Sequence, residues 1–383
     1  MTIPSTLPLR DDLVGEEPYG APQLDVPVCL NVNENPYPLD DAVADAIARR
    51  VRRIAPQLNR YPDRDHETLR RAFCDYLARE SHTRLDVSQL WGANGSNEIM
   101  LQLFQAFGGP GRSALGADPT YSMYPEYARD TFTLWHTAHR RADFSLDVDR
   151  LVAAMRETGP AIVMLTSPNN PTGTMLPMDQ LTRVLEACDE IGVQGSTRDV
   201  HPIVVVDEAY AEFRNPGTAS AVSLVERYPN LAVSRTMSKA FAFAGARVGY
   251  IAANPGIIDC LRIVRMPYHL SAITQAAALA AFEHTDEQLA RVQQLRDTRA
   301  ATATWLRSQT YHDEPLAVAD SASNFLLFGG HFDDRERIFN ELLSRGVLIR
   351  VVGPEGWLRV CMGTEQEMKT FRRALGEVLS IVE

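Results

Sequence analysis

Two polar runs follow β-branched stretches in the middle of the chain, and one of them could hold a phosphate beside a reactive amine. That run is Arg235-Thr236-Met237-Ser238-Lys239, and Arg247 follows eight positions after the lysine. Hydroxyl groups and a guanidinium bind phosphate oxygens, and a lysine amine can act as a nucleophile. The other run, Asp207-Glu208-Ala209-Tyr210, places a carboxylate and a phenol directly after Val204-Val205-Val206.

A further anion-binding pattern is the run Gly92-Ala93-Asn94-Gly95-Ser96-Asn97-Glu98, in which a glycine turn opens a helical stretch. The free amides and the positive dipole end of a helix favour an anion. An ordinary helix cap provided by Ser96 or Asn97 explains the same residues. The sequence contains no GxxxxGK[ST] motif, since Ala240 follows Lys239, and no HExxH motif or tight His/Cys cluster. We therefore expect neither a nucleotide triphosphatase nor a catalytic metal.

The polar runs lie at the ends of predicted strands that alternate with predicted helices. The strands are predicted over 113–117, 161–166, 202–206, 231–234 and 248–252, and the helices over 97–107, 149–156 and 179–191. This alternation implies crossover connections, hence an α/β fold whose largely parallel sheet is covered by helices on both faces. In such a sheet, ligands bind beyond the carboxyl ends of the strands, so the loops that follow them form the expected ligand site.

The pattern changes after about residue 271. Long helices are predicted over 272–306 and 333–345, with short strands around 323–328, 347–351 and 357–360. Such segregated helices and strands suggest a smaller α+β domain. We divide the chain into an N-terminal arm over 1–30, a large domain over 31–271, of which 31–50 contributes to the small domain, and a small domain over 272–383.

Composition argues against several classes of partner. The chain has 383 residues and a net charge of -11, so its surface repels nucleic acid and anionic membranes, and a bound anion needs a local basic pocket. The longest uncharged apolar stretch, 270–282, is too short to span a bilayer, and residues 1–20 lack the apolar region of a signal peptide. The five cysteines are scattered and show no metal-ligand spacing, so we expect them to be reduced in a cytoplasmic protein.

Three motifs resemble a known family in both order and spacing. They are Ser167-Pro168-Asn169-Asn170-Pro171-Thr172-Gly173, then Asp207-Glu208-Ala209-Tyr210, then Ser238-Lys239 with Arg247. They are similar to the motifs of fold-type-I aminotransferases, which use pyridoxal 5'-phosphate (PLP). Within that class, further runs resemble the histidinol-phosphate aminotransferase family: Leu30-Asn31-Val32-Asn33-Glu34-Asn35-Pro36-Tyr37-Pro38, Arg60-Tyr61-Pro62-Asp63, Pro119-Thr120-Tyr121 and Trp357-Leu358-Arg359-Val360. The resemblance covers nearly the whole chain from about Leu9 onward and implies a fold-type-I PLP transferase with a large and a small domain.

The resemblance assigns roles to residues that match the family motifs. Lys239 matches the lysine that holds the cofactor aldehyde and shuttles a proton, and Asp207 matches the aspartate that pairs with the pyridine nitrogen. Tyr210 and Asn170 match the partners of the cofactor 3'-oxygen, and Tyr121 matches the aromatic residue that stacks on the ring. The residues implied for the cofactor phosphate are Ser96, Asn97, Thr236, Ser238 and Arg247, with Tyr61 reaching in from the neighbouring subunit of a homodimer.

Several of these residues also have a purely structural interpretation. Asp207 suits a helix cap, and Asn170 suits an ordinary Asn-Pro turn. Tyr121 could pack in the core, and Tyr61 could lie in an exposed Tyr-Pro turn.

The resemblance also implies a second basic pocket for substrate. Arg359 matches the arginine that binds the α-carboxylate of the amino donor. The other residues expected in this pocket are Asn33, Tyr37, Asn324 and Arg350. Histidinol phosphate has no carboxylate, so one cationic pocket must bind a phosphate in one half-reaction and a carboxylate in the other. Arg350 and Arg359 together would allow this, although Arg350 equally suits a structural salt bridge.

The sequence departs from the family pattern in this pocket. Val351 stands where an aspartate is common, and Val360-Cys361-Met362-Gly363 replaces a more polar run. These differences concern the substrate and leave the cofactor site intact.

The resemblance implies transamination of histidinol phosphate with 2-oxoglutarate, giving imidazole acetol phosphate and glutamate, in histidine biosynthesis. Two alternatives keep the cofactor: an aminotransferase for an aromatic amino acid or a specialised amine, and a phospho-amino-acid decarboxylase such as phosphothreonine decarboxylase. A non-catalytic PLP-binding module is a third alternative, but it has no need of the complete motif set. The expected partners are therefore small molecules, in an enzyme that works as a homodimer with shared active sites.

Overall fold

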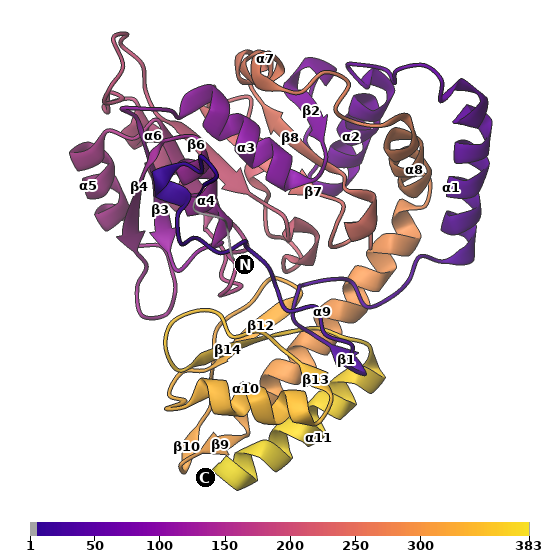
Figure 1. Cartoon of the computed structure of the whole chain (residues 1–383), viewed down its shortest axis with the longest axis vertical. Helices are drawn as coiled ribbons and strands as arrows, with labels where there is room; N and C mark the ends of the chain where they lie inside the picture. The colour runs from indigo at the N-terminus through magenta and orange to yellow at the C-terminus, as the bar shows by residue number, and fades with distance from the viewer. Residues whose placement is uncertain (1–5, 383) are drawn as a thin grey trace.

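The computed structural model describes residues 6–382 and centres on a seven-stranded sheet (Figure 1). In spatial order the strands are β2 (Leu90–Ala93), β8 (Gly249–Ala253), β7 (Leu231–Thr236), β6 (Ile203–Asp207), β5 (Ile162–Thr166), β3 (Ser113–Asp118) and β4 (Leu134–His139). β8 is antiparallel to both neighbours, and the other pairings in this sheet are parallel. The α/β class is confirmed, and each of the five predicted strands is present within two residues of its predicted bounds.

Helices cover both faces of this sheet, because adjacent strand residues point to opposite faces. On β6, Val204 and Val206 belong to one apolar core, and Ile203 and Val205 belong to the other. The first core is closed by α2 (Glu67–Glu80), α5 (Val148–Thr158) and α6 (Met178–Cys188), and the second by α3 (Ser96–Phe107), α4 (Met123–Asp130) and α7 (Pro255–Val264). Every residue of β5, β6 and β7 is buried, which explains why β5 and β6 are apolar up to their last residue and why β7 begins with Leu231-Ala232-Val233.

The C-terminal part of the chain combines helices with short strands below the large sheet (Figure 1). An antiparallel sheet contains β11 (Ala317–Val318), β12 (Phe325–Gly329) and β14 (Trp357–Cys361), and β9 (Thr310–Tyr311) pairs with β10 (Glu314–Pro315). Around them lie α9 (Thr285–Arg307), α10 (Arg335–Ser344) and α11 (Glu365–Val382). α11 has no counterpart among the helices predicted from the sequence.

The single long helix predicted over 272–306 is wrong. The chain forms α8 (Ala272–Phe282) and α9, separated by Glu283 and His284. His284 has φ -120° and ψ 35°, outside the helical region, and the Thr285 hydroxyl donates to the Phe282 carbonyl oxygen at 2.8 Å. A side chain therefore binds a carbonyl that a continuous helix would bond internally. The break lets α8 pack against α1 (Asp41–Ile54) while α9 continues into the C-terminal part.

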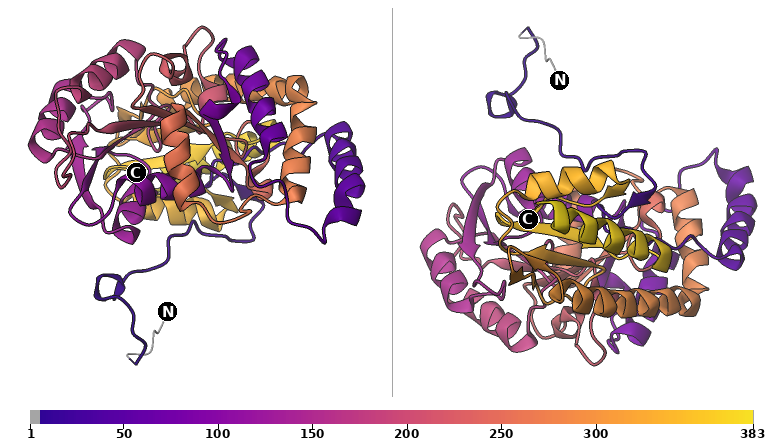
Figure 2. Two further views of the ribbon diagram at one scale, coloured as in Figure 1. Left: turned by 90° about the horizontal axis from the view of Figure 1, so that it is seen from above. Right: turned by 90° about the horizontal axis from the view of Figure 1, so that it is seen from below.

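The N-terminal segment joins the C-terminal part through one short strand. β1 (Val28–Cys29) pairs in parallel with β13 (Val347–Leu348), which is shorter than the strand predicted over 347–351. Between residue 6 and β1 the chain contains one 3-10 turn, η1 (Asp11–Leu13), and projects from the body of the protein (Figure 2). The division of the chain at residues 30 and 271 stays a proposal. Within residues 6–382, no helix has the length and apolar character needed to cross a membrane.

Candidate active site

A cavity of about 210 Å³ lies where β5, β6 and β7 end, with Arg359 of β14 contributing from the C-terminal part. The strands are parallel, so their carboxyl ends meet at one edge of the sheet and bring the polar runs together. The predicted residues that line the cavity are Asn33, Ser96, Asn97, Tyr121, Asn170, Asp207, Tyr210, Thr236, Ser238, Lys239, Arg247, Arg350 and Arg359. The described residues contain no cluster of three His, Cys, Asp or Glu side chains that could hold a metal ion.

Lys239 is one of only two lysines in the chain. The other, Lys369, is exposed on α11. The Lys239 amine donates to the Val32 carbonyl oxygen at 3.1 Å inside the cavity. Burial disfavours the ammonium form and lowers the pKa of Lys239 to about 8. A large fraction of this amine is therefore neutral in mildly alkaline solution, as a nucleophile requires.

Asp207 is a buried carboxylate at the end of β6. One oxygen accepts from the Tyr124 hydroxyl at 2.9 Å, and the other accepts from the Ala209 amide at 3.1 Å. Burial raises the pKa of Asp207 to about 6. A cation in the cavity, such as a protonated ring nitrogen, would stabilise the ionised form. The sequence interpretation missed Tyr124, which lies three residues after Tyr121 and is fully buried.

Tyr210 is oriented by Asn33, which lies 177 residues earlier in the chain. The Asn33 side-chain nitrogen donates to the Tyr210 hydroxyl oxygen at 2.8 Å. Burial raises the pKa of Tyr210, so the phenol keeps its proton at neutral pH. Because its oxygen already accepts from Asn33, the Tyr210 hydroxyl proton remains available to a ligand.

The start of α3 and the end of β7 form an anion cradle. α3 begins at Ser96, and its cap position, Gly95, makes no side-chain capping bond, so a cap provided by Ser96 or Asn97 is not what this structure contains. A Cβ atom on Gly95 would lie 2.6 Å from the Arg247 guanidinium, so glycine lets this cation approach the helix end. The hydroxyls of Thr236 and Ser238 lie 2.9 Å apart on the other side. Helix amides, hydroxyls and a guanidinium together match the donors that bind phosphate.

Arg359 and Arg350 provide a second cationic group in the cavity. Arg359 is buried, and it donates to Asn170 Oδ1 at 2.5 Å and to the Asn31 carbonyl oxygen at 2.9 Å. Arg350 pairs with Arg359 through backbone hydrogen bonds and donates to the Gly20 carbonyl oxygen at 3.4 Å. Among the described residues, no carboxylate forms an ion pair with either guanidinium. The salt bridge considered for Arg350 is therefore absent from this part of the chain, and both charges can serve an anionic ligand.

Three predicted residues lie outside the cavity of their own chain. The Arg291 guanidinium lies over the Tyr37 ring, with its central carbon 5.0 Å from the ring centre. Asn324 is fully buried and donates to the Asn33 carbonyl oxygen at 3.0 Å, so it supports the cavity wall from behind. The Tyr61 side chain is 80% exposed and stacks on Tyr268 with ring centres 4.4 Å apart.

Tyr121 lines the cavity, and its ring packs edge-on against two other tyrosines. The Tyr124 ring centre lies 5.5 Å away, and the Tyr19 ring centre lies 6.4 Å away. Tyr19 and Glu34, which also line the cavity, were missed in the sequence. Tyr19 belongs to the predicted arm, where the sequence offered no pattern that connects it to the sheet.

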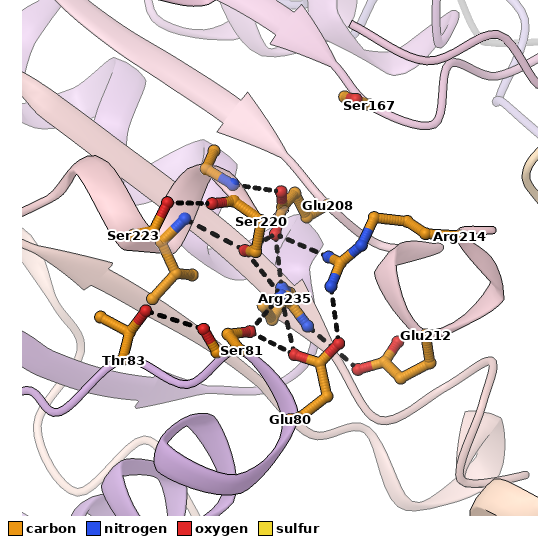
Figure 3. Close-up of polar contacts among 12 residues, drawn as sticks. Glu80, Ser81, Thr83, Ser167, Glu208, Glu212, Arg214, Ser220, Ser223 and Arg235 are labelled. Carbon is orange, nitrogen blue, oxygen red and sulfur yellow. Dashed lines mark hydrogen bonds and ion pairs between the residues drawn. The ribbon is translucent and has the colours of Figure 1, made fainter. Parts of the chain in front are cut away.

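A buried ion cluster ties α2 to the ends of β6 and β7 (Figure 3). Arg235 is fully buried and reaches three carboxylates: Glu208 at 2.8 Å, Glu212 at 3.2 Å and Glu80 at 3.3 Å. Arg214 adds a contact of 2.8 Å with Glu80. Glu208 follows Asp207 in the chain and Arg235 precedes Thr236, so the cluster holds in place the two strand ends that line the cavity.

The charges of this cluster are nearly balanced. Burial alone would raise the pKa of Glu80, but Arg235 and Arg214 bring it down to about 2. Burial raises the pKa of Glu212, whose second oxygen has no hydrogen-bond partner among the described residues. The cluster has three acids and two arginines, so one proton would make it neutral. Glu212 is the carboxyl group that would carry this proton.

The fold, the buried lysine and the two cationic groups agree with the resemblance of the sequence to aminotransferases. The aminotransferase class I and II family matches residues 26–375, nearly the whole chain. Individual relatives narrow the family further. The chain is 75% identical to histidinol-phosphate aminotransferase from Bifidobacterium longum (strain NCC 2705), over 100% of this chain and 99% of that protein. It is 53% identical to the Thermobifida fusca (strain YX) protein of the same name, over 96% of this chain and 95% of that one. The chain therefore belongs to the class I and II aminotransferases, within the histidinol-phosphate aminotransferase family.

Solved structures support the same fold. Histidinol-phosphate aminotransferase from Sinorhizobium meliloti, solved in complex with pyridoxal-5'-phosphate, gives a TM-score of 0.80 at 24% identity, over 94% of this chain and 92% of that one. A mutant aspartate aminotransferase from Thermus thermophilus gives a TM-score of 0.80 at 22% identity, over 98% of this chain and 99% of that one. Both likenesses establish the fold-type-I architecture.

Proposed function

We propose that this chain transfers the amino group of histidinol phosphate to 2-oxoglutarate, with PLP bound in the cavity. The observation that carries the proposal is the presence, in one cavity, of the Lys239 amine, the Asp207 carboxylate and two separate cationic groups. A cofactor phosphate and a substrate anion need two such groups. Relatives up to 75% identical that are named histidinol-phosphate aminotransferases support the choice of substrate.

The residues present fit PLP. The α3 amides, the hydroxyls of Thr236 and Ser238, and Arg247 would hold the phosphate, while Asp207 would pair with the pyridine nitrogen. Tyr121 would stack on the ring, and Tyr210 and Asn170 would contact the 3'-oxygen. When bound, PLP supplies an electron sink for the pair of electrons left when a proton leaves the substrate Cα.

Lys239 has two tasks in this proposal. Its neutral amine would hold the aldehyde group of PLP when the cofactor is bound. Once displaced, the Lys239 amine would accept the proton that leaves the substrate Cα and would be the group that returns it during the transfer. The pKa of about 8 suits both tasks, because the amine must accept a proton and release it again within one turnover.

The arginines account for two different substrates. Arg359 and Arg350 would bind the phosphate of histidinol phosphate in one half-reaction and the carboxylate of glutamate in the other. A guanidinium binds either anion through two parallel N–H bonds. The five cysteines are all unpaired, which is consistent with a reducing compartment, and we assign the reaction to the cytoplasm.

The test of this function is a comparison of substrates with the PLP-loaded enzyme. Glutamate formation from 2-oxoglutarate should proceed with histidinol phosphate, and kcat/KM should exceed that for phenylalanine by roughly 100-fold or more. Phosphothreonine labelled in its carboxyl group should release no labelled carbon dioxide. A preference for phenylalanine would assign the enzyme to aromatic amino acids, and release of carbon dioxide would assign it to decarboxylation.

Replacing Arg359 with alanine should weaken substrate binding and leave cofactor binding intact. The visible absorbance of bound PLP should remain, while KM for glutamate should rise by about 10- to 100-fold, as expected when a charge-assisted pair worth ~1.5 to 3 kcal/mol is lost. Arg337→Ala, which removes an exposed arginine of α10, is the matched control and should change neither quantity. Loss of PLP with an unchanged KM would show that Arg359 serves the cofactor instead.

We further propose that the enzyme is a homodimer in which Tyr61 contacts the PLP phosphate of the neighbouring subunit. Tyr61 lies outside its own cavity, and exposed apolar side chains lie on the same stretch as its stacking partner: Ile263 is 82% exposed and Met266 is 69% exposed. Such an apolar surface suits a second copy of the chain. A two-fold axis would complete both active sites by the same exchange.

Hybrid dimers test whether Tyr61 acts in trans. When Lys239→Ala subunits exchange with Tyr61→Ala subunits, one site of each hybrid receives both defects and the other receives neither. Activity per intact Lys239 should therefore rise above that of the Tyr61→Ala homodimer. An unchanged activity, after subunit exchange has been demonstrated by mass spectrometry, would place Tyr61 in its own subunit's site.

A further inference from the structure

A buried thiol, that of Cys361, lies beside Asn33, which lines the cavity. Cys361 ends β14 and is 2% exposed. Its sulfur lies 2.9 Å from the side-chain oxygen of Asn33 and accepts from the Asn33 backbone amide at 3.0 Å. The Cys361 amide donates to the Leu30 carbonyl oxygen at 3.0 Å, which fixes the backbone of β14 beside this segment. Cys361 therefore contacts Asn33 at two points.

These contacts determine which way the Asn33 amide points. With its oxygen toward the S–H group, its nitrogen faces Tyr210 and donates to the hydroxyl oxygen at 2.8 Å. In the flipped orientation the amide oxygen would accept the Tyr210 proton, and the phenol could no longer donate into the cavity. The backbone of Asn33 is also constrained, since its φ is 57° and Asn324 donates to its carbonyl oxygen at 3.0 Å. The thiol is thus the group that selects between two amide orientations.

The thiol must keep its proton for this role. Burial raises the pKa of Cys361, although Arg359 and Lys239 act in the opposite direction, and Glu34 adds to the rise. The sulfur therefore remains a donor at neutral pH. Cys188 shows that a buried thiol elsewhere in the chain has a different partner, since it donates to a carbonyl oxygen of its own helix α6.

We propose that Cys361 is a positioning residue for transamination: its S–H group orients Asn33, so that the Tyr210 hydroxyl proton is directed to the 3'-oxygen of PLP. The proposal rests on the proposed function, because it requires PLP in this cavity. A proton donated to the 3'-oxygen stabilises its anionic form. The neighbouring nitrogen that joins PLP to Lys239 then loses its proton at a lower pH.

The test is a pH titration of the visible absorbance of PLP bound to Lys239. In Cys361→Ala the pH at the titration midpoint should rise by roughly 0.5 to 1 pH unit, as expected for the loss of one ordinary hydrogen bond. Cys361→Ser retains an O–H donor and should restore the midpoint of the parent enzyme. Cys188→Ala, the matched control, removes a buried thiol away from the cavity and should leave the midpoint unchanged. Thermal unfolding of each variant shows whether it is folded.

Tyr210→Phe separates failure of this inference from failure of the function. A shifted midpoint in Tyr210→Phe with an unchanged midpoint in Cys361→Ala would overturn the role of Cys361 and leave the function standing. Parent-like midpoints in both variants would overturn the role of Cys361 together with the contact between Tyr210 and PLP. If the midpoint of Cys361→Ser equals that of Cys361→Ala, the hydrogen-bond donor is not what sets the midpoint, and the role proposed for the S–H group is wrong.

Discussion

Lys239→Ala is expected to lose transamination almost completely, with kcat reduced by about four to six orders of magnitude. The reason is that the chain has no second lysine able to take over. Lys369, the only other lysine, is exposed on α11 and is absent from the cavity lining. Steady-state assays with histidinol phosphate and 2-oxoglutarate measure the loss, and the visible absorbance should show that PLP is no longer covalently held.

Lys369 provides a matched control for Lys239→Ala, because it is the only other lysine in the chain. Lys369→Ala should keep full activity and the visible absorbance of the parent enzyme. Borohydride reduction of the PLP-loaded enzyme, followed by peptide mapping, should place the pyridoxyl group on Lys239 alone. A pyridoxyl group on Lys369, or substantial activity in Lys239→Ala, would contradict the assignment.

Arg235→Met is expected to destabilise the protein by ~3 to 5 kcal/mol, the cost typical of removing one partner from a buried ion pair. Arg235 is fully buried and contacts Glu80, Glu208 and Glu212, so its loss leaves three buried acids with Arg214 as their remaining cation in Figure 3. The decrease in the midpoint of urea unfolding, followed by circular dichroism, measures the effect.

An exposed ion pair provides the comparison for Arg235. Arg183 contacts Asp149 at 2.5 Å on the surface. Arg183→Met should therefore lower the free energy of unfolding of the protein by less than ~1 kcal/mol. Adding Glu208→Gln to Arg235→Met should recover part of the loss, because it removes one uncompensated charge. A destabilisation by Arg235→Met no larger than that by Arg183→Met would show that the cluster does not hold the strand ends.

Sequence patterns predicted five of the seven strands of the central sheet and most of the cavity, but not the two outer strands β2 and β4. β5 and β6 are buried on both faces, so each forms an apolar run up to its last residue that is visible without a structure. Parallel strands end at one edge, which is why Asp207 and Lys239 meet although neither is near the other in the chain.

Other features depend on contacts between distant residues, which local patterns do not encode. Cys361 and Asn33 are 328 positions apart, and Arg235 and Glu80 are 155 positions apart. The break between α8 and α9 contains neither proline nor glycine, so the helical pattern ran through it. Tyr37 and Asn324 match positions expected in the pocket, but in this structure Tyr37 packs against Arg291 and Asn324 supports Asn33 from behind the cavity wall.

The most direct test of the proposed reaction is one half-reaction, measured without 2-oxoglutarate. PLP-loaded enzyme is mixed with one equivalent of histidinol phosphate, and the cofactor is then released and identified by mass spectrometry. We predict nearly stoichiometric conversion of PLP to pyridoxamine 5'-phosphate, with formation of imidazole acetol phosphate, and far slower conversion with phenylalanine. PLP recovered unchanged after exposure to histidinol phosphate, from enzyme that converts phenylalanine, would contradict the proposed function.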